Sequence, residues 1–134
     1  MCYKFNRIII GILISLFFSN GIFGQSKSEK SEIIYSEVEQ KAYYPDFNIF
    51  LIKNIRYPSI AIEKGLQGQC KIEFIVHANG RLSDFIVLEE IKNCPECSDE
   101  AIRILKKSKQ WKPAKVGGSN VSSKYISIIN FKLE

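Results

Sequence analysis

At 134 residues the chain has room for one domain of ordinary size, which excludes a multidomain protein. Hydrophobic residues make up 46% and charged residues 25%, a globular composition that excludes a disordered or fibrous chain. The formal net charge of +5 is modest and does not by itself indicate a nucleic-acid-binding protein.

The first 24 residues have the pattern of a secretory signal peptide. Lys4 and Arg7 precede an apolar run of 11 residues, Ile8–Phe18, and a stretch of small and polar residues follows. The run is shorter than the roughly 20 residues that a membrane-spanning helix needs. We therefore expect a signal peptide over residues 1–24, cut near Gly24, and a periplasmic mature protein with a net charge of +3. An uncleaved short anchor in the inner membrane is the alternative.

Residues 25–46 are predicted to be a flexible leader, because Ser, Lys and Glu dominate up to Gln40 without a sustained apolar period. The predicted domain covers residues 47–134. It begins with a short helix, in which apolar residues recur at helical spacing from Phe47 to Ile55, and Pro58 ends it. Ser59 is expected to cap a second short helix that Gly65 stops.

Two strands joined by a tight turn are predicted next. Residues 70–76 alternate, with one face formed by Cys70, Ile72, Phe74 and Val76 and the other carrying Lys71 and Glu73. Asn79-Gly80 is a strong hairpin signal, because both residues tolerate positive φ. A second strand over residues 82–89 has imperfect alternation, and a bulge after the turn would reconcile Leu82 with the later residues.

A helix and a final strand complete the domain. Ser98 is the expected cap of the helix, its buried stripe includes Ala101 and Leu105, and Pro113 forbids its continuation. Trp111 is predicted to be a core residue. The last strand, residues 121–133, alternates between a buried and an open face, and the open face carries Lys124, Ile126, Ile128, Asn130 and Lys132. These elements predict an α+β fold: a small antiparallel three-stranded sheet with helices on one face.

A run of lysines near the end of this helix does not change the interpretation of the charge. The run consists of Lys106, Lys107, Lys109, Lys112 and Lys115. Cations at the end of a helix interact favourably with its exposed carbonyl groups. Because the protein is also predicted to be exported, we expect no nucleic-acid partner.

Several short motifs together resemble the C-terminal domain of the TonB energy transducers. In chain order they are Tyr57-Pro58, Ala61, Gly65, Gly68-Gln69, Phe74-Ile75-Val76, Asn79-Gly80, Glu100-Ala101, Trp111-Lys112-Pro113-Ala114, Gly118 and Asn130-Phe131. Upstream, Val38-Glu39-Gln40 and Asn54-Ile55-Arg56 are similar to the lead-in of envelope transducers. Most of these residues have structural roles, so the resemblance indicates a fold more directly than an activity.

The resemblance implies a binding function without catalysis. In such domains the final strand lies at a sheet edge and accepts an extended segment of an outer-membrane receptor, which supports TonB-dependent transport. The residues that this assigns to partner binding are Arg56, Tyr57, Pro58, Lys124, Ile126, Ile128 and Asn130. The implied partners are the receptor segment and an inner-membrane proton-channel complex. A structural homodimer that buries the same edge on itself is an alternative.

The chain departs from the energy transducers before the domain. Only about 20 residues separate the signal from the lead-in, and fully extended they reach no more than roughly 70 Å. No proline precedes Pro45 in that stretch, and Tyr44-Pro45-Asp46-Phe47 stands where a diglycine is usual. A soft spacer of this kind argues against force transmission and favours an accessory module.

The cysteines and the one histidine are the residues most capable of chemistry in this chain. Cys94 and Cys97 flank Pro95-Glu96 and are candidates for a disulfide, for unpaired thiols, or for the redox pair of a thiol-disulfide oxidoreductase. Zinc is disfavoured, because Cys70 and His77 have opposite strand parity. His77 is predicted to be a solvated side chain. We therefore predict that the protein is not an enzyme and has no cofactor or metal site.

Overall fold

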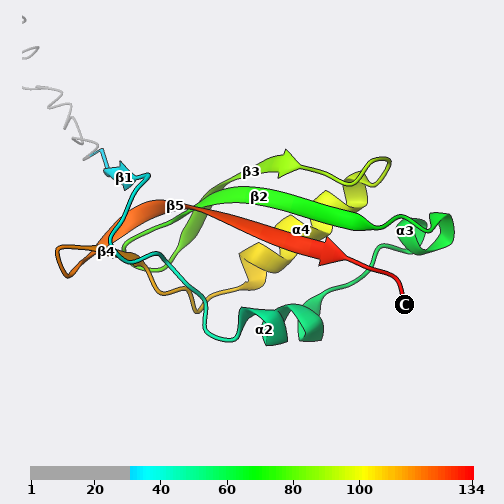
Figure 1. Ribbon diagram of the computed structural model, residues 1–134, viewed down its shortest axis with the longest axis horizontal. Helices are drawn as coiled ribbons and strands as arrows, with labels where there is room; N and C mark the ends of the chain where they lie inside the picture. The colour runs from blue at the N-terminus through cyan, green and yellow to red at the C-terminus, as the bar shows by residue number, and fades with distance from the viewer. Residues whose placement is uncertain (1–30) are drawn as a thin grey trace, which may run out of the picture. The chain divides into compact units, whose positions relative to one another are not determined.

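The computed structural model describes residues 31–134, and Glu32–Glu134 form one compact unit (Figure 1). The predicted signal peptide lies outside the described residues. Within residues 31–134, no helix is both long and apolar enough to cross a membrane. The elements in chain order are β1 (Ile34–Tyr35), α2 (Phe47–Asn54), α3 (Ser59–Lys64), β2 (Gly68–Val76), β3 (Leu82–Glu89), α4 (Pro95–Lys107), β4 (Ala114–Val116) and β5 (Ser119–Phe131).

The sheet has the strand order β1-β5-β2-β3, and β4 pairs with the start of β5. The central strand β2 is antiparallel to both β3 and β5, and its ladder with β5 runs from Gly68↔Phe131 to Val76↔Ser123. The predicted α+β class is therefore confirmed. The predicted count of three strands is wrong, because β4 forms a hairpin with β5 and β1 adds a short parallel pairing.

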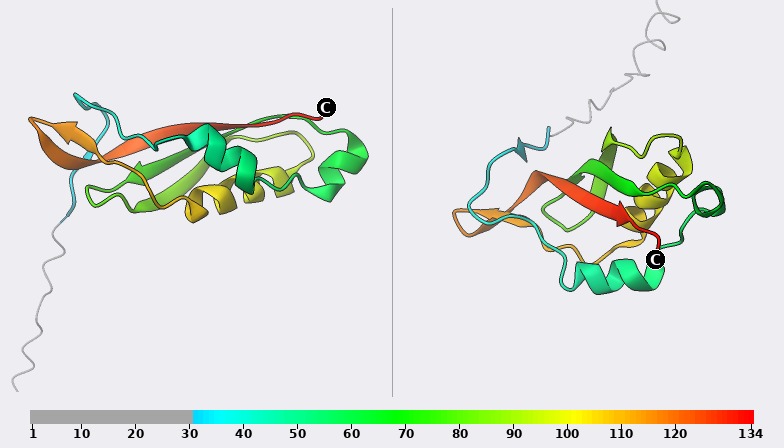
Figure 2. Two further views of the ribbon diagram at one scale, coloured as in Figure 1. Left: turned by 90° about the horizontal axis from the view of Figure 1, so that it is seen from below. Right: turned by 45° about the vertical axis from the view of Figure 1, so that its right-hand side comes forward.

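The core lies on one face of the sheet, between β2, β5 and α4. Alternate residues of β2 are buried, as their spacing predicts, and they pack with Ile129 and Phe131 of β5 and with Ala101 and Leu105 of α4. Trp111 is only 4% exposed, and its indole Nε1–H donates to the Ser108 hydroxyl at 2.8 Å. Figure 1 shows α4 behind the strands and α2 alongside β5, on the side away from β2, and the right view of Figure 2 shows the same place for α2.

The hairpin between β2 and β3 has the predicted turn at Gly80 and the predicted bulge after the turn. Gly80 has a φ of 82°, in the region that glycine tolerates. Glu73 pairs with Ile86, but Ile75 pairs with Ser83, so β3 contains one extra residue here. Asp84, with a φ of 55°, lies within this bulge. A second register shift lies farther along, between Lys71 and Ile72.

The predicted cap of α4 is wrong. The helix begins at Pro95 and not after Ser98, and Ser98 is a buried residue inside it. Proline suits the first helical position because its φ is already close to the helical value and it needs no N–H partner there. A disulfide between Cys94 and Cys97 also spans the first turn of the helix.

Part of the predicted leader packs on the domain. Ile34 and Tyr35 pair with β5, Gln40 bridges to Lys115, and Tyr43 bridges to Lys112. The Tyr44 ring lies 5.6 Å from the Trp111 ring, centroid to centroid. Residues from Glu32 onward therefore belong to the same compact unit as residues 47–134.

Candidate functional site

One edge of β5 is open over most of its length. Ser123 pairs with Val76 on one edge and with Tyr35 on the other, so β1 and β2 flank β5 on opposite sides. Beyond Ser123, no strand or bridge among residues 31–134 pairs with the side facing away from β2. We call this stretch, Lys124–Phe131, the outer edge of β5. It leaves backbone N–H and C=O groups available to another chain.

The sequence-predicted side chains of β5 line the outer edge. Ile126 is 49% exposed and Ile128 is 48% exposed, while the alternate residues Ser127 and Ile129 are buried. Lys124 and Asn130 lie exposed on the same open face as the two isoleucines, and the Lys124 ammonium is 3.9 Å from a Glu73 carboxylate oxygen. The structure thus brings these four predicted residues together beside the edge.

The other three predicted residues are divided between two places. The Tyr57 ring packs on Phe131 at the end of β5, 5.5 Å between centroids, and its hydroxyl donates to the Leu66 carbonyl at 2.5 Å. Arg56 and Pro58 instead line a shallow hollow with residues of the first half of α4. Tyr57 also lines this hollow, so it connects the hollow to the end of β5.

The Arg56 backbone is fixed to α4 through a carboxylate. Its N–H donates to Glu100 at 2.7 Å, and the Arg103 guanidinium donates to both oxygens of the same carboxylate at 2.7 Å. Burial alone would raise the pKa of Glu100, but these bonds outweigh it and hold the pKa below its usual value. Glu100 therefore stays ionised at neutral pH and holds the Arg56–Pro58 segment against α4.

A groove of about 730 Å³ lies at the start of the outer edge. One wall is the chain after β1, including Val38 and Lys41, and the other is Ser123–Ile126 with Glu73. Sequence reasoning missed this groove because it treated residues 25–46 as a flexible leader. A strand of two residues, β1, has no apolar period that could have revealed the pairing.

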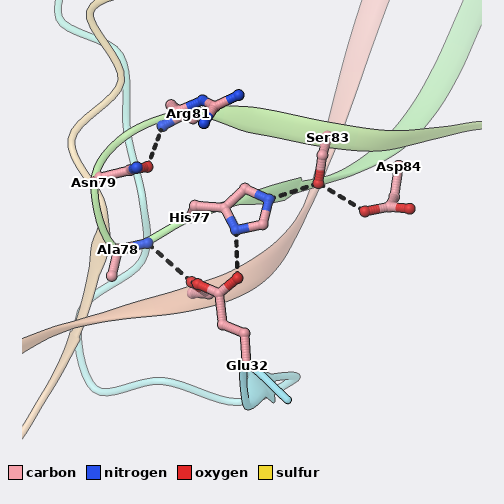
Figure 3. A network of polar contacts seen from close by, with 8 residues as sticks. Glu32, His77, Ala78, Asn79, Arg81, Ser83 and Asp84 are labelled. Carbon is pink, nitrogen blue, oxygen red and sulfur yellow. Dashed lines mark hydrogen bonds and ion pairs between the residues drawn. The ribbon is translucent and has the colours of Figure 1, made fainter. Parts of the chain in front are cut away.

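A polar network attaches the chain at β1 to the hairpin (Figure 3). Glu32 contacts His77 Nδ1 at 2.7 Å and also accepts a hydrogen bond from the Ser122 hydroxyl, which in turn accepts from the Ala78 N–H at 2.9 Å. The Ser122 bond, opposed by partial burial and aided by His77, holds the pKa of Glu32 below its usual value. The prediction that His77 is solvated is wrong: its side chain is 24% exposed and is bonded at both ring nitrogens.

This network superficially resembles a catalytic triad, since a carboxylate, an imidazole and a serine hydroxyl stand in series. Ser83 Oγ lies 2.6 Å from His77 Nε2, but it also donates to Asp84 at 2.6 Å. Its single proton is therefore committed to Asp84, so His77 must donate to Ser83. Because the Ser83 proton points to Asp84, the hydroxyl does not donate to the imidazole, and the arrangement is a chain of hydrogen bonds that attaches the chain at β1 to the hairpin.

The cysteines are buried in the core. Cys94 and Cys97 form a disulfide, and Cys70 is a free thiol whose Sγ lies 3.9 Å from Ser98 Oγ. All three side chains are inaccessible to solvent, and burial raises the pKa of the Cys70 thiol. Among the described residues, no group of three or more His, Cys, Asp and Glu side chains is placed to hold a metal ion.

Comparison with known proteins gives one family. The family model described as the Gram-negative bacterial TonB protein C-terminal matches residues 53–133. The solution NMR structure of the TonB C-terminal domain of Pseudomonas aeruginosa is 28% identical, covers 59% of this chain and 78% of its own, and has a TM-score of 0.48. That of Helicobacter pylori is 19% identical, covers 64% of this chain and 90% of its own, and also has a TM-score of 0.48. No curated protein sequence matches this chain.

Proposed function

Because this chain belongs to the family of the Gram-negative bacterial TonB protein C-terminal domain, we propose that it binds an extended segment of an outer-membrane receptor. The segment adds as a strand to the outer edge of β5. The module works in the periplasm and supports TonB-dependent transport across the outer membrane. It does so by binding, without catalysis.

The observation that carries the proposal is the open backbone of β5. Eight residues, Lys124–Phe131, pair with β2 on one side, while their other side has no partner within residues 31–134. An added strand of equal length would be about 26 Å long. Main-chain hydrogen bonds along such an edge give affinity with little demand on sequence, and side chains at alternate positions give specificity.

The side chains beside the edge suit a segment with apolar residues at alternate positions. Ile126 and Ile128 are each about half exposed and form an apolar stripe next to the edge. The side chains of an added strand would cover part of the exposed area of both isoleucines, which contributes free energy in proportion to the apolar area removed from water. At the end of β5, Tyr57 adds an aromatic surface, because its ring already packs on Phe131.

Thiol-disulfide exchange is less well supported by the same structure. Exchange requires a thiolate to reach a disulfide sulfur atom. Cys94 and Cys97 are both fully buried, so another protein's thiolate has no access to either sulfur in this conformation. The disulfide is better explained as a clamp on the start of α4.

Replacing Ile126 and Ile128 together by threonine is expected to weaken receptor-peptide binding about tenfold or more. Threonine keeps the branched Cβ that suits a strand but loses most of the apolar surface. The ligands are synthetic peptides that cover the periplasmic N-terminal segment of an outer-membrane receptor from the same bacterium. Affinity is measured by calorimetry, and thermal unfolding is compared in parallel.

Ile86→Thr is the matched control, since Ile86 is 51% exposed on the same open face but belongs to β3. It should leave affinity unchanged. Equal affinities for the wild type and the double variant would contradict the proposal, and so would a wild type that binds none of the peptides. If concentrated protein dimerises and the double variant does not, the edge serves self-association instead.

A further inference from the structure

The outer edge of β5 does not begin at the end of the strand, because β1 already occupies its first positions. Ile34 pairs in parallel with Ser122, and Tyr35 pairs with Ser123, on the side facing away from β2. A strand that adds to Lys124–Phe131 therefore lies in line with β1. One of its ends must meet Tyr35.

One side chain attaches the chain just before β1 to the rest of the sheet. Glu32, two residues before β1, contacts His77, which directly follows β2 (Figure 3). Glu32 also accepts a hydrogen bond from Ser122 of β5. The Glu32 carboxylate lies 2.7 Å from His77 Nδ1, so the two side chains are within hydrogen-bond distance. The other ring nitrogen of His77 contacts Ser83, which donates in turn to Asp84 of β3.

After Tyr35 the chain turns away from the outer edge. It is held again by paired backbone bonds between Gln40 and Lys115, at 2.9 and 3.1 Å, and between Tyr43 and Lys112, at 2.8 and 3.0 Å. Residues 36–42 consequently form one wall of the groove whose other wall includes Ser123–Ile126. A strand that adds to β5 would therefore end in this groove.

We propose that β1, positioned by Glu32, is a stop that sets the length of the added strand. Pairing ends at Lys124, so a bound segment forms no more than eight backbone pairs, with Lys124–Phe131. The terminal residue of that segment lies in the groove, between Lys41 and Glu37 on the leader and Lys124 and Glu73 on the sheet. This inference rests on the proposed function and adds a limit on which segments the edge accepts.

A series of receptor peptides of increasing length tests the stop. For the wild type, affinity should rise up to eight residues and then stay level. Glu32→Ala removes both bonds of the positioning residue and should free the edge at Ser122 and Ser123. A ten-residue peptide should then bind about tenfold tighter than an eight-residue peptide, because two more backbone pairs form. Glu63→Ala, which removes an exposed carboxylate of α3, should behave like the wild type.

Amide hydrogen exchange of the peptide-free protein provides the second readout. The amides of β1, Ser122 and Ser123 should exchange faster in Glu32→Ala than in the wild type. Unchanged exchange would mean that Glu32 does not position β1. Affinity that keeps rising beyond eight residues in the wild type would overturn the stop and leave the proposed function intact. If the wild type binds no peptide, the proposed function fails and the stop fails with it.

Discussion

Replacing Trp111 by alanine is expected to lower the free energy of unfolding by about 3–5 kcal/mol. The indole is 4% exposed and packs against the rings of Tyr44, Phe74 and Tyr125 at centroid distances of 5.6, 5.3 and 4.9 Å. It therefore joins the leader, β2 and β5 around one side chain. Total stabilities of small domains are about 5–15 kcal/mol, so denaturant titration should show a large loss or an unfolded variant.

Two further variants separate the causes of this loss. Trp111→Phe keeps an aromatic ring but removes the bond to the Ser108 hydroxyl, and we expect a smaller loss of about 1–2 kcal/mol. Tyr43→Ala removes an aromatic side chain that is 48% exposed, and it should change stability by no more than about 0.5 kcal/mol. A loss as small for Trp111→Ala as for Tyr43→Ala would contradict the central place of Trp111 in the core.

Replacing Gly80 by alanine is expected to cost about 2–4 kcal/mol for two separable reasons. The φ of 82° is strained for a residue with a Cβ. A Cβ at this position would also lie 2.7 Å from the Trp111 carbonyl oxygen, which belongs to the backbone and cannot rotate away. The hairpin would have to move from the segment that carries Trp111, and chemical denaturation would report the cost.

Gly118→Ala isolates the first of these reasons. Gly118 has a similar φ of 77°, but a Cβ there meets no atom within 4 Å. We expect a loss of about 1 kcal/mol, from backbone strain alone. Similar losses for the two variants would show that the close approach of Gly80 to Trp111 does not matter for stability.

The sequence predicted the elements whose signals are local. β2 alternates over nine residues, Asn79-Gly80 closes the hairpin, and the imperfect alternation of β3 indicated the bulge that the structure has at Asp84. Each of these signals comes from neighbouring residues, because strand period and turn chemistry depend on short-range geometry. The alternation of β5 likewise predicted that Ile126 and Ile128 lie on the open face.

Features that depend on distant partners were not predictable in this way. β1 has only two residues, too few to show an alternation of apolar and polar side chains. It is a strand because it pairs with the edge of β5. His77 has the parity of an exposed residue, but its partner Glu32 lies 45 positions earlier in the chain. The open edge of β5 was expected only through the resemblance to a family. The residue pattern of a strand does not indicate whether the strand has a neighbour on both sides.

Strand addition to β5 can be observed without any substitution, by NMR of the protein with a bound receptor peptide. We predict backbone contacts between the peptide and Lys124–Phe131, with amides at alternate positions of that stretch protected from exchange on binding. The exposed edge of β3 should be unaffected. Peptide contacts confined to β3 or to the helices, with the exchange of β5 amides unchanged, would contradict binding at the outer edge.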